Sequence, residues 1–203
     1  RTCRGAASAG HLEMLQWARA NGADWRECTT LRAAEKGYIE VLQWARGEGC
    51  PWYPTAVCLA AIDNGHLGTL KWMLSQGCRL PVTASDVAAR HGHLHVLQWM
   101  HANDHAWDNA IYSVCRAAAL GGQLHVLQWA RANGFDWNSE TCSVAAHSGH
   151  LGFLKWARFN GCPWDQETCT CAAAAGHLHI LQWARAHGCP WDILTCREAA
   201  RRG

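Results

Sequence analysis

The chain has 203 residues, a formal net charge of +2 at pH 7 and 13 tryptophans. Such a small net charge argues against a partner that is recognised mainly through charge, such as duplex DNA or an anionic membrane surface. The wholly apolar runs are only a few residues long, so the sequence predicts no membrane-spanning helix.

One corner motif recurs along the chain: a glycine, then His, Tyr or Gln, then Leu or Ile. The corner glycines, spaced by 27, 28, 27, 30, 27 and 27 residues, are Gly10, Gly37, Gly65, Gly92, Gly122, Gly149 and Gly176. A first tryptophan follows each of them by seven residues, at Trp17, Trp44, Trp72, Trp99, Trp129, Trp156 and Trp183. A second tryptophan closes every repeat except the third, where Leu80 replaces it, at Trp25, Trp52, Trp107, Trp137, Trp164 and Trp191. We expect a single array over residues 1–203, with about seven repeats, a partial repeat at each end and further repeats beyond both ends in a longer protein.

The sequence of each repeat predicts two helices, and the seventh repeat serves as the example. Asp165 can cap the first helix, whose small alanines continue to Ala175 before Gly176 ends it. The second helix opens at His177 and cannot pass Pro190. It is apolar around more than half of its circumference, so it must be covered on two sides. The predicted fold class is therefore all-α, a solenoid of stacked antiparallel helix pairs.

An arginine falls in the last turn of most second helices. A cation suits this place because the helix dipole is negative at its carbonyl end. We expect these side chains to bond exposed carbonyls there: Arg19, Arg46, Arg131, Arg158 and Arg185.

Twelve cysteines would indicate disulfides in a secreted chain. Six of them, however, lie seven residues before a corner glycine or its equivalent, and four follow the glycine that ends the second helix. Equivalent positions in adjacent repeats should lie about 10 Å apart, whereas a disulfide needs Cα atoms within about 7 Å. We therefore expect buried, reduced thiols and an intracellular location, cytoplasmic or nuclear.

The pattern T-C-x-x-A-A-x-x-G-H-L-x-x-L-x-W-x-x-x-x-G-C-P-W-D resembles the helix pair of the ankyrin repeat. The residues that match its T-P-L-H-x-A-A-x-x-G-H-x stretch are Thr168, Ala172, Ala173, Gly176, His177 and Leu178. Residues 188–192 resemble the family's G-A-D-V-N ending, and the corner histidines match its capping position. The repeats are about five or six residues shorter than the 33 of that family, so the resemblance implies truncated hairpin fingers. It also implies that another protein is recognised on the concave face built by fingers and first helices.

The tryptophans are predicted to belong to the core. Burying one indole is worth at most about 4 to 6 kcal/mol, against about 1 to 3 kcal/mol for stacking one nucleic-acid base. An exposed ladder would also need a basic groove, which a net charge of +2 does not supply. Two alternatives stay open: single-stranded nucleic-acid binding by a tryptophan ladder, and a structural spacer between other domains.

One histidine cluster departs from the repeat. His101 and His105 are four residues apart with Asp104 between them, a spacing that suits zinc on one helix face. No third or fourth ligand is evident, so we expect a structural role and no metal.

The one long insertion, of three residues, lies between Trp107 and Cys115. Insertions on a solenoid map to one face, often the binding face. Within this longer finger, Ile111 and Tyr112 are our predicted anchor for a partner, because an apolar residue lies beside a tyrosine.

Non-repeated side chains of the fingers and first helices complete the candidate site. They are Asp108, Asn109, Arg116, Arg90, His91, Glu35, Lys36, Asp63, Asn64, Asp86, His147 and Gln166, together with Arg4 and Arg32. Their mixed signs indicate a composite epitope on a partner protein. The sequence has no Gly-rich phosphate loop, nucleophile motif or distinctive carboxylate pair, so we expect no enzyme activity, no cofactor and no small-molecule substrate. The predicted function is a protein-binding scaffold.

Overall fold

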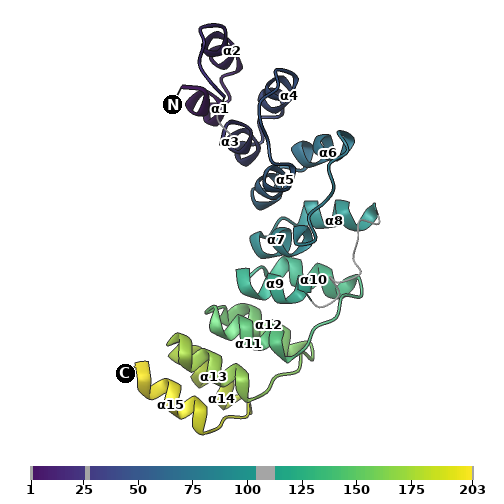
Figure 1. Ribbon diagram of the computed structural model, residues 1–203. Helices are drawn as coiled ribbons and strands as arrows, with labels where there is room; N and C mark the ends of the chain where they lie inside the picture. Colours follow the sequence, from purple (N-terminus) through teal and green to yellow (C-terminus); the bar gives the residue numbers. More distant parts are fainter. Residues whose placement is uncertain (1, 26–27, 104–112, 203) are drawn as a thin grey trace. The chain divides into compact units, whose positions relative to one another are not determined.

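The structure is a computed structural model that describes residues 2–25, 28–103 and 113–202. Within these ranges it contains fifteen helices and no strand (Figure 1). The first helices of the repeats are α1 (Thr2–Ala9), α3 (Cys28–Lys36), α5 (Pro54–Asp63), α7 (Ala84–His91), α9 (Ser113–Gly121), α11 (Ser139–His147), α13 (Gln166–Ala175) and α15 (Ile193–Arg202). The second helices are α2 (Leu12–Ala20), α4 (Ile39–Gly47), α6 (Leu67–Ser75), α8 (Leu94–Ala102), α10 (Leu124–Ala132), α12 (Leu151–Phe159) and α14 (Leu178–Ala186). The predicted all-α fold of stacked helix pairs with truncated fingers is confirmed.

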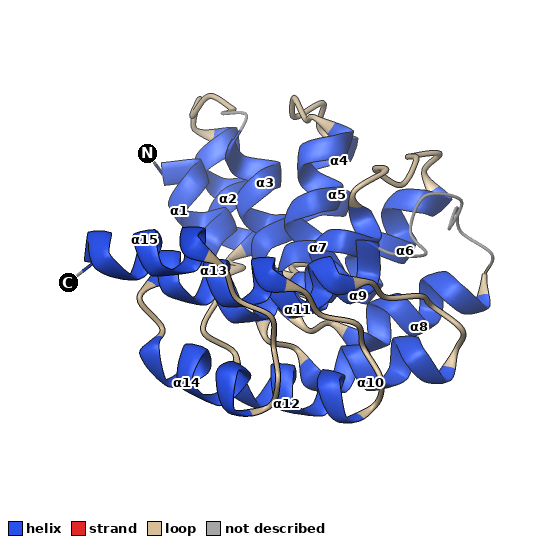
Figure 2. Cartoon of the chain, turned by 90° about the horizontal axis from the view of Figure 1, so that it is seen from below, coloured by secondary structure: helices blue, strands red, loops and turns tan. Residues whose placement is uncertain are grey.

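The chain divides into two compact blocks, residues 1–88 with 95–105 (block 1) and residues 89–94 with 106–203 (block 2). In block 1, the first helices α1, α3 and α5 pack in series, and each also packs on the second helix that follows it. In block 2, α9, α11, α13 and α15 pack in series in the same way. Figure 2 shows α10, α12 and α14 in one row and α11, α13 and α15 in another. Within each block, these first helices therefore pack on the second helix of their own repeat and on the first helix of the next repeat. None of the described helices combines the length and the apolarity needed to cross a bilayer.

Small side chains fill the layer between the first helices. The residues three and four positions before each corner glycine are alanines, with one isoleucine, and all are buried: Ala6, Ala7, Ala33, Ala34, Ala61, Ile62, Ala88, Ala89, Ala118, Ala119, Ala145, Ala146, Ala172 and Ala173. Alanine has high helix propensity and lets two helix backbones approach closely. The second helices add one larger buried residue per turn, such as Leu42, Leu127 and Leu154. The core is therefore built from alanine and leucine.

Eight of the twelve cysteines are buried in this core, as predicted: Cys3, Cys50, Cys58, Cys115, Cys142, Cys162, Cys169 and Cys189. Burial raises the pKa of Cys58 to about 11 and that of Cys115 to about 12, so both remain neutral thiols. The prediction was wrong for Cys196, which is exposed, and Cys28, Cys78 and Cys171 are only partly buried.

Two cysteine pairs form inside single repeats, which the sequence analysis did not anticipate. A hydrogen bond to Cys142, together with burial, raises the pKa of Cys162. A hydrogen bond to Cys169 and burial raise the pKa of Cys189 in the same way. Both pairs join the first helix to the residue after the second helix, twenty positions later. Reasoning about adjacent repeats could not find them because the partners belong to one repeat.

The corner glycines satisfy two requirements at once. Gly37 and Gly122 have φ values of 73° and 69°, in the left-handed region that favours glycine. A Cβ atom on Gly37 would lie 2.6 Å from Nδ1 of His66 in the next repeat, and one on Gly122 would lie 2.6 Å from Nδ1 of His150. Neighbouring repeats thus pack a ring directly against the corner backbone, and any side chain would push them apart.

A histidine also links each of several repeats to the one before it. The ring Nε2 atoms of His66, His150 and His177 donate to the backbone carbonyls of Glu35, Leu120 and His147, at 3.1, 3.3 and 3.1 Å. In two other repeats the histidine three positions after the corner takes this role: His95 bonds the Gly65 carbonyl at 2.8 Å, and His125 bonds that of Gly92 at 2.9 Å. We call these bonds the inter-repeat histidine links.

The capping role implied for the corner histidines is corrected by these contacts. His66, His150 and His177 do stand at the N-cap positions of α6, α12 and α14, but their side chains make no capping hydrogen bond. Their rings contact the preceding repeat instead. Asp165, by contrast, caps α13 as predicted, because its Oδ1 accepts from the Glu167 amide at 3.0 Å.

The tryptophans lie outside the core, so the prediction of core packing was wrong. None of the described tryptophans is fully buried, and Trp17 and Trp191 are 66% and 43% exposed; Trp107 lies outside the described residues. The second tryptophan of one repeat instead contacts the first tryptophan of the next, as in Trp25 with Trp44, where the ring centroids are 5.5 Å apart. The same pairing joins Trp52 to Trp72, Trp137 to Trp156 and Trp164 to Trp183. We call the described tryptophans together, whether half-buried in these pairs or exposed, the tryptophan layer.

Arginines cover the outer rings of the tryptophan layer. The guanidinium carbon of Arg131 lies 4.4 Å from the ring centroid of Trp137, and Arg19, Arg46, Arg158 and Arg185 lie in the same way over Trp25, Trp52, Trp164 and Trp191. Arg131 also donates to the carbonyl of Phe135 at 2.5 Å, and Arg158 to that of Cys162 at 3.1 Å. Arg19, Arg131 and Arg158 do bond backbone carbonyls, but these lie three residues beyond the helix ends, so the prediction that they bond the last carbonyls of the helix is corrected. In the third repeat, Leu74 replaces the arginine and Leu80 replaces the tryptophan, so both members of the cation-π pair are changed there.

Candidate partner-binding site

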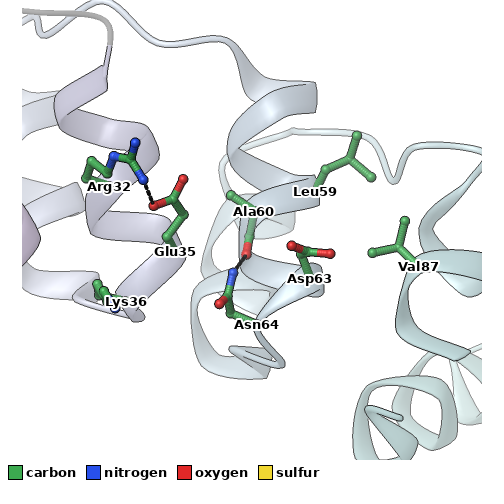
Figure 3. A pocket seen from close by; sticks show the side chains of 8 residues that line it. All are labelled: Arg32, Glu35, Lys36, Leu59, Ala60, Asp63, Asn64 and Val87. Carbon is green, nitrogen blue, oxygen red and sulfur yellow. Dashed lines mark hydrogen bonds and ion pairs between the residues drawn. The ribbon is translucent and has the colours of Figure 1, made fainter. Parts of the chain in front are cut away.

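Five of the predicted binding residues line one hollow of about 430 Å³ in block 1 (Figure 3). Its lining comes from α3, α5 and α7: Arg32, Glu35, Lys36, Leu59, Ala60, Asp63, Asn64 and Val87. All three elements are first helices; α3 and α5 pack on each other through small buried alanines, and α7 contributes Val87. We call it the first-helix hollow.

The first-helix hollow combines both charges with an apolar patch. Arg32 Nη1 and Glu35 Oε2 form an ion pair of 2.5 Å along α3. On the neighbouring helix, Asn64 Nδ2 donates to the Ala60 carbonyl at 2.9 Å, which fixes the orientation of that amide. Leu59 and Val87 project toward each other from α5 and α7 in Figure 3. The surface thus offers an acceptor, donors and apolar contact within one hollow.

The variable positions of the repeat build this surface. Residues one, two, five and six positions before the corner glycine share one helix face, because the first pair lies three to five positions after the second pair, about one helical turn. Two positions before the corner, the seven repeats carry Ser8, Glu35, Asp63, Arg90, Leu120, His147 and Ala174. The buried positions of the same helices repeat alanine with little change. Uniform packing inside and variation outside are what a modular recognition surface requires.

Three further predicted residues lie on the first helices of block 2. The Arg116 Nε atom forms an ion pair of 2.6 Å with Glu140 Oε1, which connects α9 to α11. His147 ends α11, and its backbone carbonyl accepts the histidine link from His177. Gln166 begins α13, and its carbonyl accepts from Thr170 Oγ1 at 3.1 Å. All three side chains belong to the first helices, but they do not gather around one described hollow.

The remaining described candidates are Arg4, which is exposed on α1, and three residues of α7. Asp86 is in its first turn, and one carboxylate oxygen is buried without a hydrogen-bond partner within the described part of the chain. Arg90 and His91 are exposed at its end. A Cβ on Gly121 would lie 1.8 Å from the Arg90 carbonyl oxygen, so glycine is required where α9 approaches α7. The predicted anchor Ile111 and Tyr112, with Asp108 and Asn109, lies outside the described residues.

Sequence reasoning missed the apolar part of the first-helix hollow. Leu59, Ala60 and Val87 line it, yet only charged or polar residues were selected from these helices. The signal was present, because Leu59 and Ala60 lie four positions before Asp63 and Asn64, on the same helix face. Selection by charge alone discarded them.

No metal-ligand cluster is found among the described residues, where no three His, Cys, Asp or Glu side chains are placed to share an ion. The cluster considered from the sequence cannot be assembled from these residues. His101 is exposed in the last turn of α8, whereas Asp104 and His105 lie outside the described ranges.

Comparison with known proteins agrees with the architecture. No family model matches the sequence, and no curated protein matches it either. Among solved structures, the ankyrin repeat domain of human ASB11 is similar, with a TM-score of 0.61 and 15% sequence identity. The match covers 80% of this chain and 85% of that domain. The chain therefore has the ankyrin-repeat fold, as the recurring helix-pair motif predicted.

Proposed function

We propose that this chain is a non-catalytic scaffold that binds a partner protein through its first-helix face, with the first-helix hollow as one contact site. The observation that carries the proposal is that Glu35, Lys36, Asp63 and Asn64, all at variable positions of the repeat, line one hollow. A partner that meets them must offer complementary charges of both signs around an apolar group. Such composite surfaces give specificity, because a mismatched partner leaves charges unpaired.

The ankyrin-repeat fold supports this proposal, since folds of this kind generally serve protein-protein interaction and are generally non-catalytic. The recurrence of one motif through both blocks supports a single array over residues 1–203. Buried thiols such as Cys58 and Cys115 support a reducing, intracellular compartment, because they are embedded as apolar core residues.

The tryptophan layer argues against the nucleic-acid alternative. A single-stranded reader needs aromatic faces on which successive bases can stack. Here the outer ring of a typical pair, such as Trp137, is covered by Arg131 on one side and contacts Trp156 on another. A base would have to displace contacts that already stabilise the fold.

Charge reversal at the first-helix hollow tests the proposal. The full chain and a variant carrying Glu35→Arg and Asp63→Arg would be used to capture proteins by crosslinking from cell lysate with and without nuclease treatment. A matched control reverses two exposed glutamates of second helices in the same block, Glu13→Arg and Glu40→Arg. Circular dichroism would verify that both variants are folded.

We expect the amount of partner protein captured to be lower by about tenfold or more with the hollow variant than with the unmodified chain, and to be unchanged with the control. Equal capture by both variants would place binding elsewhere and overturn this assignment. Loss of all partners on nuclease treatment would instead favour nucleic acid.

A further inference from the structure

Helix α12 departs from the other second helices at two positions that together change its surface. Phe159 ends the helix where the other repeats carry Ala20, Gly47, Ser75, Ala102, Ala132 and Ala186. Gly152 stands where all but one of the others carry glutamate or histidine: Glu13, Glu40, His95, His125 and His179. One change adds a large ring, and the other removes a large side chain seven positions earlier. Two turns of helix separate these positions, so they lie along one face.

These changes border a hollow of about 660 Å³ across the second helices of block 2. Its lining comes from α10, α12 and the region of α14: Leu124, Gly152, Lys155, Trp156, Arg158, Phe159, Trp183 and His187. The Phe159 side chain is 91% exposed, the largest exposed aromatic surface among the described residues. A Cβ on Gly152 would meet no atom within 4 Å, so that glycine is not required by packing. We call this site the α12 hollow.

The aromatic wall of the α12 hollow is held in place by its own contacts. The His187 ring stacks on Trp183 with centroids 4.5 Å apart, and its Nδ1 bonds the Trp183 carbonyl at 2.7 Å. Trp164 packs edge-on against the same indole, with centroids 5.7 Å apart. The wall is therefore rigid before any ligand arrives, which lowers the entropic cost of binding.

The charged groups of the α12 hollow have one sign. Lys155 and Arg158 line it, and no carboxylate is among the lining residues. The Lys155 Nζ atom lies 6.0 Å from the Trp183 ring centroid, and the Arg158 guanidinium lies 4.6 Å from that of Trp164. Two cations thus flank an aromatic wall beside an exposed phenyl ring.

We propose that the α12 hollow binds an acidic segment of a partner protein that inserts one large apolar side chain beside Phe159. The carboxylates of that segment meet Lys155 and Arg158, and its apolar side chain fills the space that Gly152 leaves open. This surface lies on second helices and is therefore separate from the first-helix hollow. Single-stranded nucleic acid fits less well, because both the Trp183 and Trp164 rings already have partners and a lone phenyl ring gives no run of stacking faces.

Peptide binding to the full chain tests the inference. Two fluorescein-labelled probes would be compared by fluorescence anisotropy at about 150 mM salt: Asp-Glu-Asp-Phe-Asp-Glu-Asp, and the same peptide with serine in place of phenylalanine. We expect the phenylalanine probe to bind about tenfold or more tightly than the serine probe. A third probe, Lys-Lys-Lys-Phe-Lys-Lys-Lys, should bind weakest because its charge is reversed.

Matched variants locate the site. Phe159→Ala restores the residue of four other repeats, and it should reduce affinity for the phenylalanine probe to that for the serine probe. Gly152→His restores the residue of α8, α10 and α14, and it should weaken binding about tenfold by filling the hollow. The control is Gly68→His, the same change at the same position of α6, where Lys71 is retained but Ser75 replaces the phenylalanine. It should leave binding unchanged.

Several results would overturn the inference. One is that the phenylalanine probe shows no saturable binding, and another is that the phenylalanine and serine probes bind with equal affinity. A third is that Gly152→His and Gly68→His change the affinity for the phenylalanine probe equally. Binding of an oligothymidine that is lost in Phe159→Ala would assign the surface to nucleic acid instead. Urea melts of each variant separate loss of binding from loss of fold, and Phe159→Ala should melt with the parent because the ring is almost fully exposed.

Discussion

The core between the helices and the tryptophan layer both recur along the chain, yet they place residues by opposite rules. The core holds the small residues, such as Ala118 and Ala119, fully buried between closely packed helices. The tryptophan layer holds the largest side chains, and Trp17 remains 66% exposed. Close helix packing excludes large rings, which are placed where the loops leave room and where arginines cover them. The size of an apolar residue therefore does not predict its burial in this fold.

The sharpest test of this contrast truncates one large residue from each layer. Leu127 is fully buried, so Leu127→Ala should lower the free energy of unfolding by about 3 kcal/mol. Trp17→Ala removes a larger but mostly exposed side chain and should cost less than about 1 kcal/mol. Urea denaturation followed by circular dichroism measures both. A greater loss from the tryptophan than from the leucine would reverse our assignment of the core.

The corner glycines give the next effect. Gly122→Ala should cost about 2 to 4 kcal/mol, because it combines a left-handed φ with a clash against His150. Gly134→Ala is the control, since its φ of 81° is also left-handed but its Cβ would meet nothing within 4 Å. That change should cost only about 1 kcal/mol. If urea denaturation gives both variants the same stability, the ring contact at the corner contributes nothing.

The buried thiols make the core sensitive to high pH. Burial raises the pKa of Cys115 to about 12 from an ordinary value of 9.0, so between these values the folded state keeps a proton that the unfolded state loses. Rising pH therefore favours unfolding, and the contribution of this thiol is fully present below pH 9 and is lost toward pH 12. One such thiol lowers the free energy of unfolding by at most about 1.4 kcal/mol per pH unit in this range.

The measurement compares urea melts from pH 8 to 11 for the parent, Cys115→Ala and Cys196→Ala. The first variant should show a shallower fall in stability with pH, while the exposed Cys196 variant should follow the parent. Lysines and tyrosines titrate equally in all three chains. Parallel curves for all three would mean that Cys115 is accessible to solvent or ionises in the folded state.

The smallest effect lies in the tryptophan layer itself. A double-mutant cycle with Arg131→Leu and Trp137→Leu should give a coupling energy of about 0.5 to 1 kcal/mol, typical of a partly exposed cation-π pair. The leucine pair is chosen because the third repeat carries Leu74 and Leu80 at these positions. Strictly additive effects of the two changes on the free energy of unfolding would show that arginine and tryptophan stabilise the fold independently.

Much of the fold could be predicted because it depends on local signals. Asp165, Gly176 and Pro190 mark helix ends through backbone chemistry that acts within a few residues. The tryptophan layer could not be predicted in this way, since apolar periodicity shows which face is covered but not how much space is available there. Likewise, His177 was correctly placed at a helix start, but its bond partner, the His147 carbonyl, lies thirty residues earlier in another repeat.

The candidate site was predictable to a smaller extent. Charged residues at variable positions pointed to Glu35 and Asp63, and the structure brings both to one hollow. The α12 hollow escaped notice because each of its changes is a single substitution in a helix that otherwise fits the repeat. Gly152 and Phe159 become informative only when the hollow between them is seen.

The inter-repeat histidine links explain how an array of this kind can gain or lose whole repeats. A repeat of 27 residues contains both partners of this interaction. It has a backbone carbonyl that accepts a hydrogen bond from the following repeat, and a histidine ring that donates one to the preceding repeat. Duplication of such a repeat creates a complete new histidine link without compensating changes elsewhere. Genes for arrays of this kind can therefore grow or shrink by whole repeats, while single exposed positions are left to diversify.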